Sequence, residues 1–183
     1  MSAPRSTQDQ ATPHPIRPTQ PTPTLTVETV AGGIWTLRER QPDRFTMLVF
    51  YRGLHCPVCR TYLSELDRKL DEFMRRGVEV IAISGDDAER ARCTVEEWKL
   101  ARLTIGYGQS IASMREWELF VSRGIKDAEP ELFGEPGLFL VRPDGTLYYA
   151  AVNSMPFGRP RLDDMLAAVD FIIARDYPAR GEA

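Results

Sequence analysis

Residues 45–59 read FTMLVFYRGLHCPVC and place two cysteines directly after an almost continuous apolar run. The run from Phe45 to Tyr51 is typical of a buried central strand. From Pro57 onward apolar residues recur at helical spacing, and proline suits the first helical position because its missing N–H would be unpaired there. We therefore expect Cys56 at a helix N-terminus, where backbone N–H groups and the helix dipole favour a thiolate. The segment predicts a redox site.

The spacing of Cys56 and Cys59 allows them to cycle between dithiol and disulfide. Residues three apart share one side of a helix, with Cβ atoms roughly 5–6 Å apart, and a modest adjustment gives disulfide geometry. We expect Cys56 to be the exposed nucleophile. Cys59 is expected to resolve a mixed disulfide or a sulfenic acid formed on Cys56. His55 and Arg52 are candidates to place positive charge near the thiolate.

A zinc site is the main alternative for a Cys-x-x-Cys pair, and it needs four ligands. Beyond the pair, the chain offers only Cys93, His14 and His55. We therefore expect neither a metal site nor a cofactor. Cys93 falls in the middle of a predicted helix and is expected to be a small buried apolar side chain. Three cysteines exclude a disulfide-rich scaffold.

The composition narrows the classes of partner. The 183 residues include 23 Lys and Arg against 26 Asp and Glu, a net charge of −3 with no block of like charges. This favours neither nucleic acid nor a membrane surface as partner, and no apolar run approaches the roughly 20 residues of a membrane span. Residues 1–24 are rich in Pro, Thr and Gln and predict a flexible tail without a signal segment, hence a cytoplasmic protein. Residues 25–183 are expected to form one domain.

Around the cysteine segment the sequence predicts a βαβ half followed by a ββα half. Strands at 45–51 and 78–84 flank a helix that ends near Gly77, an order that normally gives parallel strands joined by a right-handed crossover. The expected fold class is α/β, with a central mixed sheet flanked by helices. Further elements are expected as strands at 25–30, 34–37 and 103–105, helices from Asp86 or Asp87 to 101, at 111–120 and at 163–177, and a hairpin of 138–141 with 146–152.

Three motifs carry a resemblance to a known family. The segment from Phe50 to Cys59, the triplet Ser84-Gly85-Asp86 and the stretch from Glu135 to Gly145 resemble peroxiredoxin-like members of the AhpC/TSA group, in the thioredoxin-fold superfamily. The similarity runs from about residue 25 to 177. It implies a thioredoxin-like fold in which Pro136 takes the position of a cis-proline beside the redox cysteine.

The resemblance also implies an antioxidant thiol oxidoreductase that acts on a peroxide or a disulfide. Its partner would be an external dithiol reductant of the thioredoxin-like or glutathione system, and a homodimer is a candidate assembly. Peroxiredoxins use an arginine near the thiolate, for which Arg52, Arg142 and Arg159 are candidates and Arg52 is favoured. They also carry a Pro seven residues before the peroxidatic cysteine and a Thr or Ser three before it, where this chain has Val49 and Gly53.

These departures leave dithiol exchange better supported by the sequence than peroxidase action. Two alternatives stay open: a thioredoxin-like thiol–disulfide oxidoreductase without peroxidase activity, and a non-catalytic binding module switched by the redox state of the cysteines. The supporting residues proposed for the site are Arg52, Gly53, His55 and Pro136. Gly53 is expected to let the backbone approach Cys56 closely, as a tight turn would also require. The loop of residues 155–160 has two interpretations, a wall of the active site and a plain connector, and the plain connector is favoured.

Overall fold

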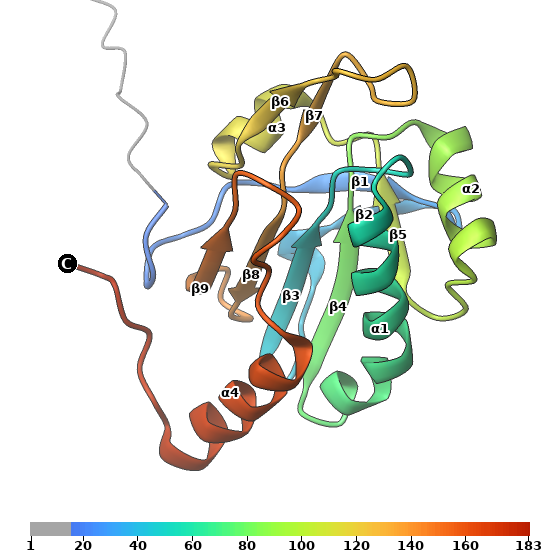
Figure 1. Cartoon of the computed structure of the whole chain (residues 1–183). Helices are drawn as coiled ribbons and strands as arrows, with labels where there is room; N and C mark the ends of the chain where they lie inside the picture. The colour runs from blue at the N-terminus through green and yellow to red at the C-terminus, as the bar shows by residue number, and fades with distance from the viewer. Residues whose placement is uncertain (1–15) are drawn as a thin grey trace, which may run out of the picture.

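The computed structural model describes residues 16–183 of the chain. Its centre is a seven-stranded mixed sheet in the order β2-β1-β5-β4-β3-β8-β9, and a second, two-stranded sheet joins β6 to β7. Helices α1 and α4 lie side by side over one face of the large sheet, and the β6–β7 hairpin stands beyond its upper end in Figure 1. The expected α/β fold class, a mixed sheet flanked by helices, is confirmed.

The central strand β3 (Phe45–Phe50) is buried along its whole length. It pairs in parallel with β4 (Val78–Ile83) and antiparallel with β8 (Gly137–Val141). Its side chains alternate between two apolar clusters, so that Met47 and Val49 face α1 and α4 while Leu48 and Phe50 face the opposite layer. Burial on both faces explains why this strand is a continuous apolar run rather than an alternating one.

Helix α1 (Pro57–Met74) begins at the cysteine pair and positions the second cysteine. Its buried face carries Cys59, Leu63, Leu66 and Phe73, all at helical spacing, and these side chains pack on β3 and β4. Helix α4 (Leu162–Arg175) lies against the same face of the sheet. The N-terminus of α1 therefore stands at the carboxyl ends of β3 and β4, where a crossover connection must begin.

The remaining elements agree with the predicted order except for one insertion. The hairpin β6 (Val121–Arg123) and β7 (Leu132–Gly134) was not expected, because neither segment alternates clearly. The other elements are β1 (Thr26–Thr29), β2 (Ile34–Thr36), the short 3-10 helix η1 (Leu37–Glu39), α2 (Ala88–Trp98), β5 (Thr104–Tyr107), α3 (Ile111–Glu116) and β9 (Leu147–Val152). No helix in residues 16–183 is long and apolar enough to cross a membrane.

The expected tail of residues 1–24 falls partly on residues 1–15, outside the described part of the chain. Its remaining residues are held in place, which differs from the expectation of flexibility. Thr19 N–H donates to the carbonyl of Leu147 (2.8 Å), and Leu147 N–H donates to the carbonyl of Gln20 (2.9 Å). Residues 19–22 thus pair with the outer edge of β9.

The homodimer expected from the sequence stays a prediction.

Two further expectations are wrong in detail. The described residues contain no cis peptide bond, so Pro136 is trans. Glu135 and Pro136 carry the chain in extended form from β7 into β8, and an X–Pro bond prefers the trans form by about 0.5–1 kcal/mol. Cys93 lies in α2 as expected, but it is only partly buried, because it does not share the face that buries Ala91, Thr94 and Trp98.

Candidate active site

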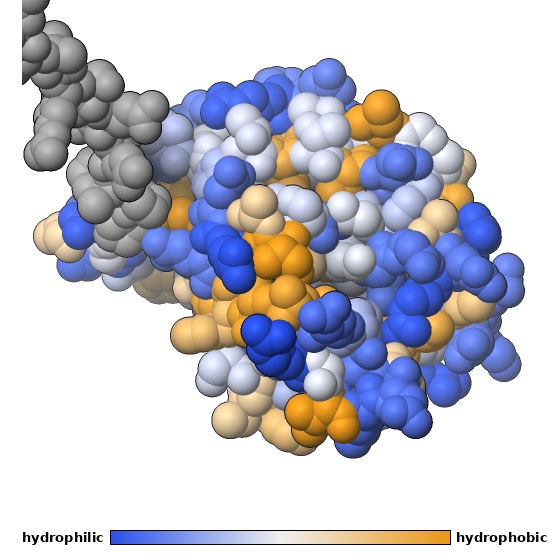
Figure 2. Space-filling view, turned by 90° about the horizontal axis from the view of Figure 1, so that it is seen from above, coloured by the Kyte–Doolittle hydropathy of each residue, from blue (hydrophilic) through white to orange (hydrophobic). Residues whose placement is uncertain are grey.

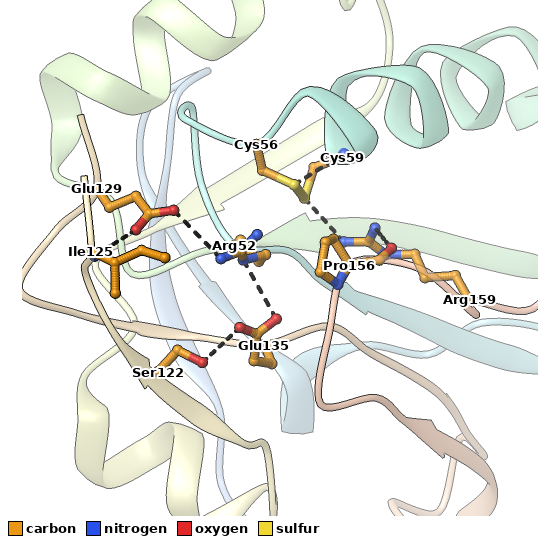
Figure 3. A network of polar contacts seen from close by, with 9 residues as sticks. All are labelled: Arg52, Cys56, Cys59, Ser122, Ile125, Glu129, Glu135, Pro156 and Arg159. Atoms are coloured by element: carbon orange, nitrogen blue, oxygen red, sulfur yellow. Dashed lines mark hydrogen bonds and ion pairs between the residues drawn. A yellow bond between two sulfur atoms is a disulfide. The ribbon is translucent and has the colours of Figure 1, made fainter. Parts of the chain in front are cut away.

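Cys56 and Cys59 form a disulfide at the N-terminus of α1 (Figure 3). Cys56 is the N-cap residue of the helix, Pro57 follows at its first position, and the Cα atoms of the two cysteines are 5.2 Å apart. Cys59 N–H donates to Cys56 Sγ over 3.2 Å, so a sulfur takes the place usually filled by a capping oxygen. The structure brings the pair together as the sequence predicts.

Both cysteines are buried, with exposed fractions of 1% for Cys56 and 0% for Cys59. The expectation of an exposed Cys56 is wrong for this disulfide form. Cys59 shares the buried face of α1 with Leu63 and Leu66, so its sulfur points into the core. The bond to Cys59 keeps the sulfur of Cys56 there as well.

Gly53 holds the loop before Cys56 against a buried carboxylate. Its φ is +126°, and a Cβ atom built there would lie 2.7 Å from an oxygen of Asp86. The next residue, Leu54, donates its N–H to Asp86 Oδ2 over 2.8 Å. Glycine is thus required at position 53 because the backbone there passes close to Asp86. The expected reason, a close approach of the backbone to Cys56, does not explain the glycine.

Asp86 is a site residue that sequence reasoning missed. Its side chain is fully buried and accepts a charge-assisted hydrogen bond from Arg90 Nε over 2.8 Å. Arg90 also donates to the carbonyl of Ala128, in the loop between β6 and β7. One carboxylate therefore joins the cysteine loop, α2 and the inserted hairpin. The sequence had marked Asp86 only as part of a family resemblance and as a possible first residue of the next helix, whose N-cap is Asp87.

Arg52, the favoured arginine, forms ion pairs with two carboxylates. Its Nη2 lies 3.6 Å from Glu129 Oε1, and its Nε lies 3.4 Å from Glu135 Oε2 (Figure 3). Its guanidinium also stacks on the ring of Phe133, 4.6 Å from the ring centroid. Its charge is therefore compensated within the site. Arg52 fastens the β6–β7 hairpin to the cysteine loop, and its assignment as the arginine beside the thiolate stays a prediction.

Arg159 is the arginine that reaches the disulfide. Its Nη2 donates to Cys59 Sγ over 3.1 Å, and its Nη1 donates to the carbonyl of Pro156 over 3.1 Å (Figure 3). The guanidinium stacks on the ring of Tyr62 at 5.2 Å, and the Tyr62 hydroxyl donates to the carbonyl of Pro160. Burial lowers the pKa of Arg159 to about 10, so the side chain stays positively charged at neutral pH.

The loop between β9 and α4 consequently walls the site, which is the less favoured of the two interpretations given for it. Asn153 N–H, at its start, donates to the carbonyl of Pro136 over 2.9 Å. The supporting role expected for Pro136 stays a prediction. Met155 and Phe157 on the same loop are 53% and 63% exposed. Figure 2 shows apolar residues gathered in the middle of this end of the molecule, with polar residues around them. Arg142, the third candidate, lies elsewhere and stacks on Tyr148.

His55 does not supply positive charge to the thiolate. Its ring packs on Phe133 with centroids 4.8 Å apart, and both of its ring nitrogens are buried without a hydrogen-bond partner in residues 16–183. Burial lowers the pKa of His55 below its ordinary value of 6.5, and the charge of Arg52 lowers it further. The imidazole is therefore neutral at neutral pH. Within the same residues, no group of three or more His, Cys, Asp or Glu side chains could hold a metal ion.

Replacing Gly53 tests how the cysteine loop is fixed. Gly145→Ala is the matched control, because Gly145 also has a positive φ (+81°) but nothing lies within 4 Å of its added Cβ. We expect Gly145→Ala to lower the free energy of unfolding by about 1–2 kcal/mol. Gly53→Ala should lower it by about 1–3 kcal/mol more, since its Cβ also collides with Asp86. Urea denaturation measures both; equal losses would show that Asp86 does not constrain the loop.

His55→Phe tests the neutral imidazole through the pH dependence of stability. The pKa of His55 in the folded chain lies below its ordinary value of 6.5. As the pH falls below 6.5, the imidazole of the unfolded chain therefore takes up a proton before the imidazole of the folded chain does. The free energy of unfolding of the wild type should therefore decrease there relative to His55→Phe, and the two should differ by a constant above about pH 7.5. Parallel curves from pH 8 to 5.5 would contradict the lowered pKa.

Comparison with known proteins agrees with this geometry. The AhpC/TSA family matches residues 18–150. No curated protein matches the chain. Among solved structures, a reduced 2-Cys peroxiredoxin of Plasmodium vivax is 20% identical, with a TM-score of 0.71 over 88% of this chain and 84% of that chain.

Two bacterial structures are similar in the same way. Peroxidoxin BcpB of Mycobacterium tuberculosis is 13% identical, with a TM-score of 0.69 over 86% of this chain and 98% of that chain. A peroxiredoxin-like protein of Aquifex aeolicus is 16% identical, with a TM-score of 0.69 over 87% and 90%. At these identities the likeness shows the fold, while the family match extends over most of the chain. The protein is an oxidoreductase that belongs to the AhpC/TSA family, with a peroxiredoxin-like fold and a Cys-x-x-Cys disulfide.

Proposed function

We propose that the protein is a thiol-dependent peroxidase in which Cys56 reacts with the peroxide and Cys59 resolves the product. The observation that carries this proposal is the Cys56–Cys59 disulfide at the N-terminus of α1. Its position supports a reactive Cys56, because a helix N-terminus stabilises a thiolate. Membership of the AhpC/TSA family supports a peroxide as the substrate.

In the oxidative half-reaction the Cys56 thiolate attacks one oxygen of a hydroperoxide. The O–O bond breaks, the distal oxygen leaves as an alcohol or water after taking a proton, and Cys56 becomes a sulfenic acid. The Cys59 thiolate then attacks the sulfur of Cys56, the S–O bond breaks, and water leaves after a second proton transfer. The product is the disulfide, with Cα atoms 5.2 Å apart.

An external dithiol completes the cycle by thiol–disulfide exchange. Its first thiolate bonds to Cys56 Sγ, the Cys56–Cys59 bond breaks, and Cys59 leaves as a thiolate. Its second thiolate then attacks the first sulfur of the reductant and displaces Cys56 as a thiolate, so the dithiol is released as a disulfide with both cysteines reduced. The thioredoxin-like or glutathione system is the chemical class of reductant expected. No part of this cycle needs a metal or a cofactor.

The main competing activity is disulfide exchange without peroxide reduction. Gly53 and Val49 stand where typical peroxiredoxins carry a hydroxyl residue and a proline. The Asp86 carboxylate occupies the space that a side chain at position 53 would need. A peroxide in this site would therefore be oriented by groups other than a hydroxyl at that position, and Arg159 is a charged group in contact with Cys59 Sγ.

Hydroperoxide consumption by the pre-reduced protein separates the two activities. We expect the wild type to consume peroxide with dithiothreitol as reductant, Cys56→Ser to show only the background rate, and Cys59→Ser to stall after one turnover. Mass spectrometry should show a loss of about 2 mass units in the wild type and a gain of about 32 in Cys59→Ser, as Cys56 passes on to sulfinic acid. Cys93→Ser is the matched control and should behave like the wild type.

A peroxide rate equal to that of a free thiol would contradict the peroxidase proposal. In that case, reduction of a protein disulfide by the wild type but not by Cys56→Ser would identify a thiol–disulfide oxidoreductase. Turnover of neither substrate, with partner binding that depends on Cys56, would identify a redox-switched binding module.

A further inference from the structure

Arg159 is a half-buried cation without a carboxylate partner in residues 16–183. Arg52 and Arg90, which also belong to the site, both form ion pairs with Asp or Glu. Arg159 makes hydrogen bonds only to the carbonyl of Pro156 and to Cys59 Sγ, and its buried Nε–H has no partner in the same residues. Its environment therefore holds a positive charge with no counter-charge in contact.

A buried charge without a counter-charge lowers the stability of the folded protein, so folding alone does not account for it. Moving a charged group out of water costs free energy unless a partner of opposite charge compensates it. The lowered pKa of Arg159, caused mainly by burial, reflects this cost, although the group remains charged at pH 7. Groups with unfavourable electrostatics of this kind concentrate where a charge appears during function.

We propose that the missing anion is the thiolate of Cys59, and that Arg159 keeps the resolving cysteine deprotonated in both half-reactions. The proposal deepens the function given above and depends on its assignment of Cys59 as the resolving residue. The contact already exists in the disulfide, where Arg159 Nη2 lies 3.1 Å from Cys59 Sγ (Figure 3). Breaking the S–S bond places a full negative charge on the atom that the guanidinium touches.

In reduction, the thiolate of an external dithiol attacks Cys56 Sγ and forms a new S–S bond to it. The Cys56–Cys59 bond breaks and its electron pair goes to Cys59 Sγ, which faces Arg159. Thiol–disulfide exchange is faster when the leaving thiolate is more stable, so Arg159 directs the attack to Cys56. The second thiolate of the reductant then attacks the reductant's first sulfur in the mixed disulfide. The S–S bond to Cys56 breaks, and Cys56 leaves as the thiolate that the N-terminus of α1 stabilises.

In oxidation, the same ion pair makes Cys59 a nucleophile. The Cys59 thiolate attacks the sulfur of the Cys56 sulfenic acid, and the departing hydroxide takes a proton and becomes water. The thiolate of Cys56 is stabilised in a different way, because Cys59 N–H and the N-terminus of α1 face its sulfur. Each sulfur is thus served by its own donor, the helix for Cys56 and the guanidinium for Cys59.

The surroundings of Arg159 fix its position relative to the sulfur. The aromatic ring of Tyr62, on α1, supports the guanidinium, and the Tyr62 hydroxyl holds the carbonyl of Pro160, the next residue in the loop. The same helix therefore carries Cys59 and the platform for its partner. A rigid placement of this kind lets a charge act without reorganisation.

The thiol pKa of Cys59 in the reduced protein tests the proposal. It is measured in a Cys56→Ser background, from the pH dependence of iodoacetamide alkylation of Cys59 followed by mass spectrometry. We expect Arg159→Met to raise this pKa by about 1–3 units, the effect of an opposite charge in contact, and Arg159→Lys to raise it less. Arg142→Met is the matched control, because Arg142 also stacks on a tyrosine (4.8 Å from Tyr148) but lies in another pocket.

The equilibrium with dithiothreitol gives a second readout in the two-cysteine protein. Loss of the ion pair destabilises the reduced form, so the disulfide of Arg159→Met should be harder to reduce by about tenfold, which corresponds to about 30 mV. A merely structural role for Arg159 would leave this equilibrium and the Cys59 pKa unchanged. Circular dichroism of each variant monitors folding, and Arg159→Lys decides the matter if Arg159→Met does not fold.

An unchanged Cys59 pKa in Arg159→Met and Arg159→Lys would overturn the inference, and so would an equal change in Arg142→Met. Neither measurement uses a peroxide. A protein without peroxidase activity can therefore still show the Arg159 effect, and an active peroxidase can fail to show it, which keeps the two proposals separable.

Discussion

The geometry of the site depends on one buried carboxylate. Asp86 accepts the N–H of Leu54, pairs with Arg90 and fills the space beside Gly53. This contact sets the path of the chain between the end of β3 and the start of α1, and thereby where Cys56 caps the helix. The identity of residue 53 follows from it, because a positive φ and a neighbouring carboxylate together leave room only for glycine.

The parts of this protein that could be predicted from sequence are those in which a local pattern has one physical meaning. The apolar run from 45 to 51, the proline after Cys56 and the helical spacing beyond it determine a strand, a helix start and a redox pair within twenty residues. The β6–β7 hairpin has no such pattern. Its position depends on contacts to Arg52 and Arg90, which a local window does not contain.

The choice among arginines shows the same limit. Arg52 is four residues from Cys56, yet it forms ion pairs with the carboxylates at 129 and 135. Arg159 is 100 residues from Cys59 and still makes the contact to sulfur. Proximity along the chain does not identify the arginine that contacts the disulfide, because the partners of both arginines lie far from them in the sequence. The proline-rich loop that carries Arg159 is held by contacts to Pro136 and Tyr62. Its sequence has no pattern that would rank Arg159 above Arg52.

The backbone pairing of residues 19–22 with β9 has a consequence for assembly. An outer strand with open N–H and C=O groups can recruit a strand from another chain. Here the protein covers the beginning of its own outer strand, and among the described residues only β8 pairs with the rest of β9. An association along that edge is thereby shifted toward residue 152, where the strand runs into the loop of Arg159. A second copy that paired there would lie next to the loop that carries Arg159.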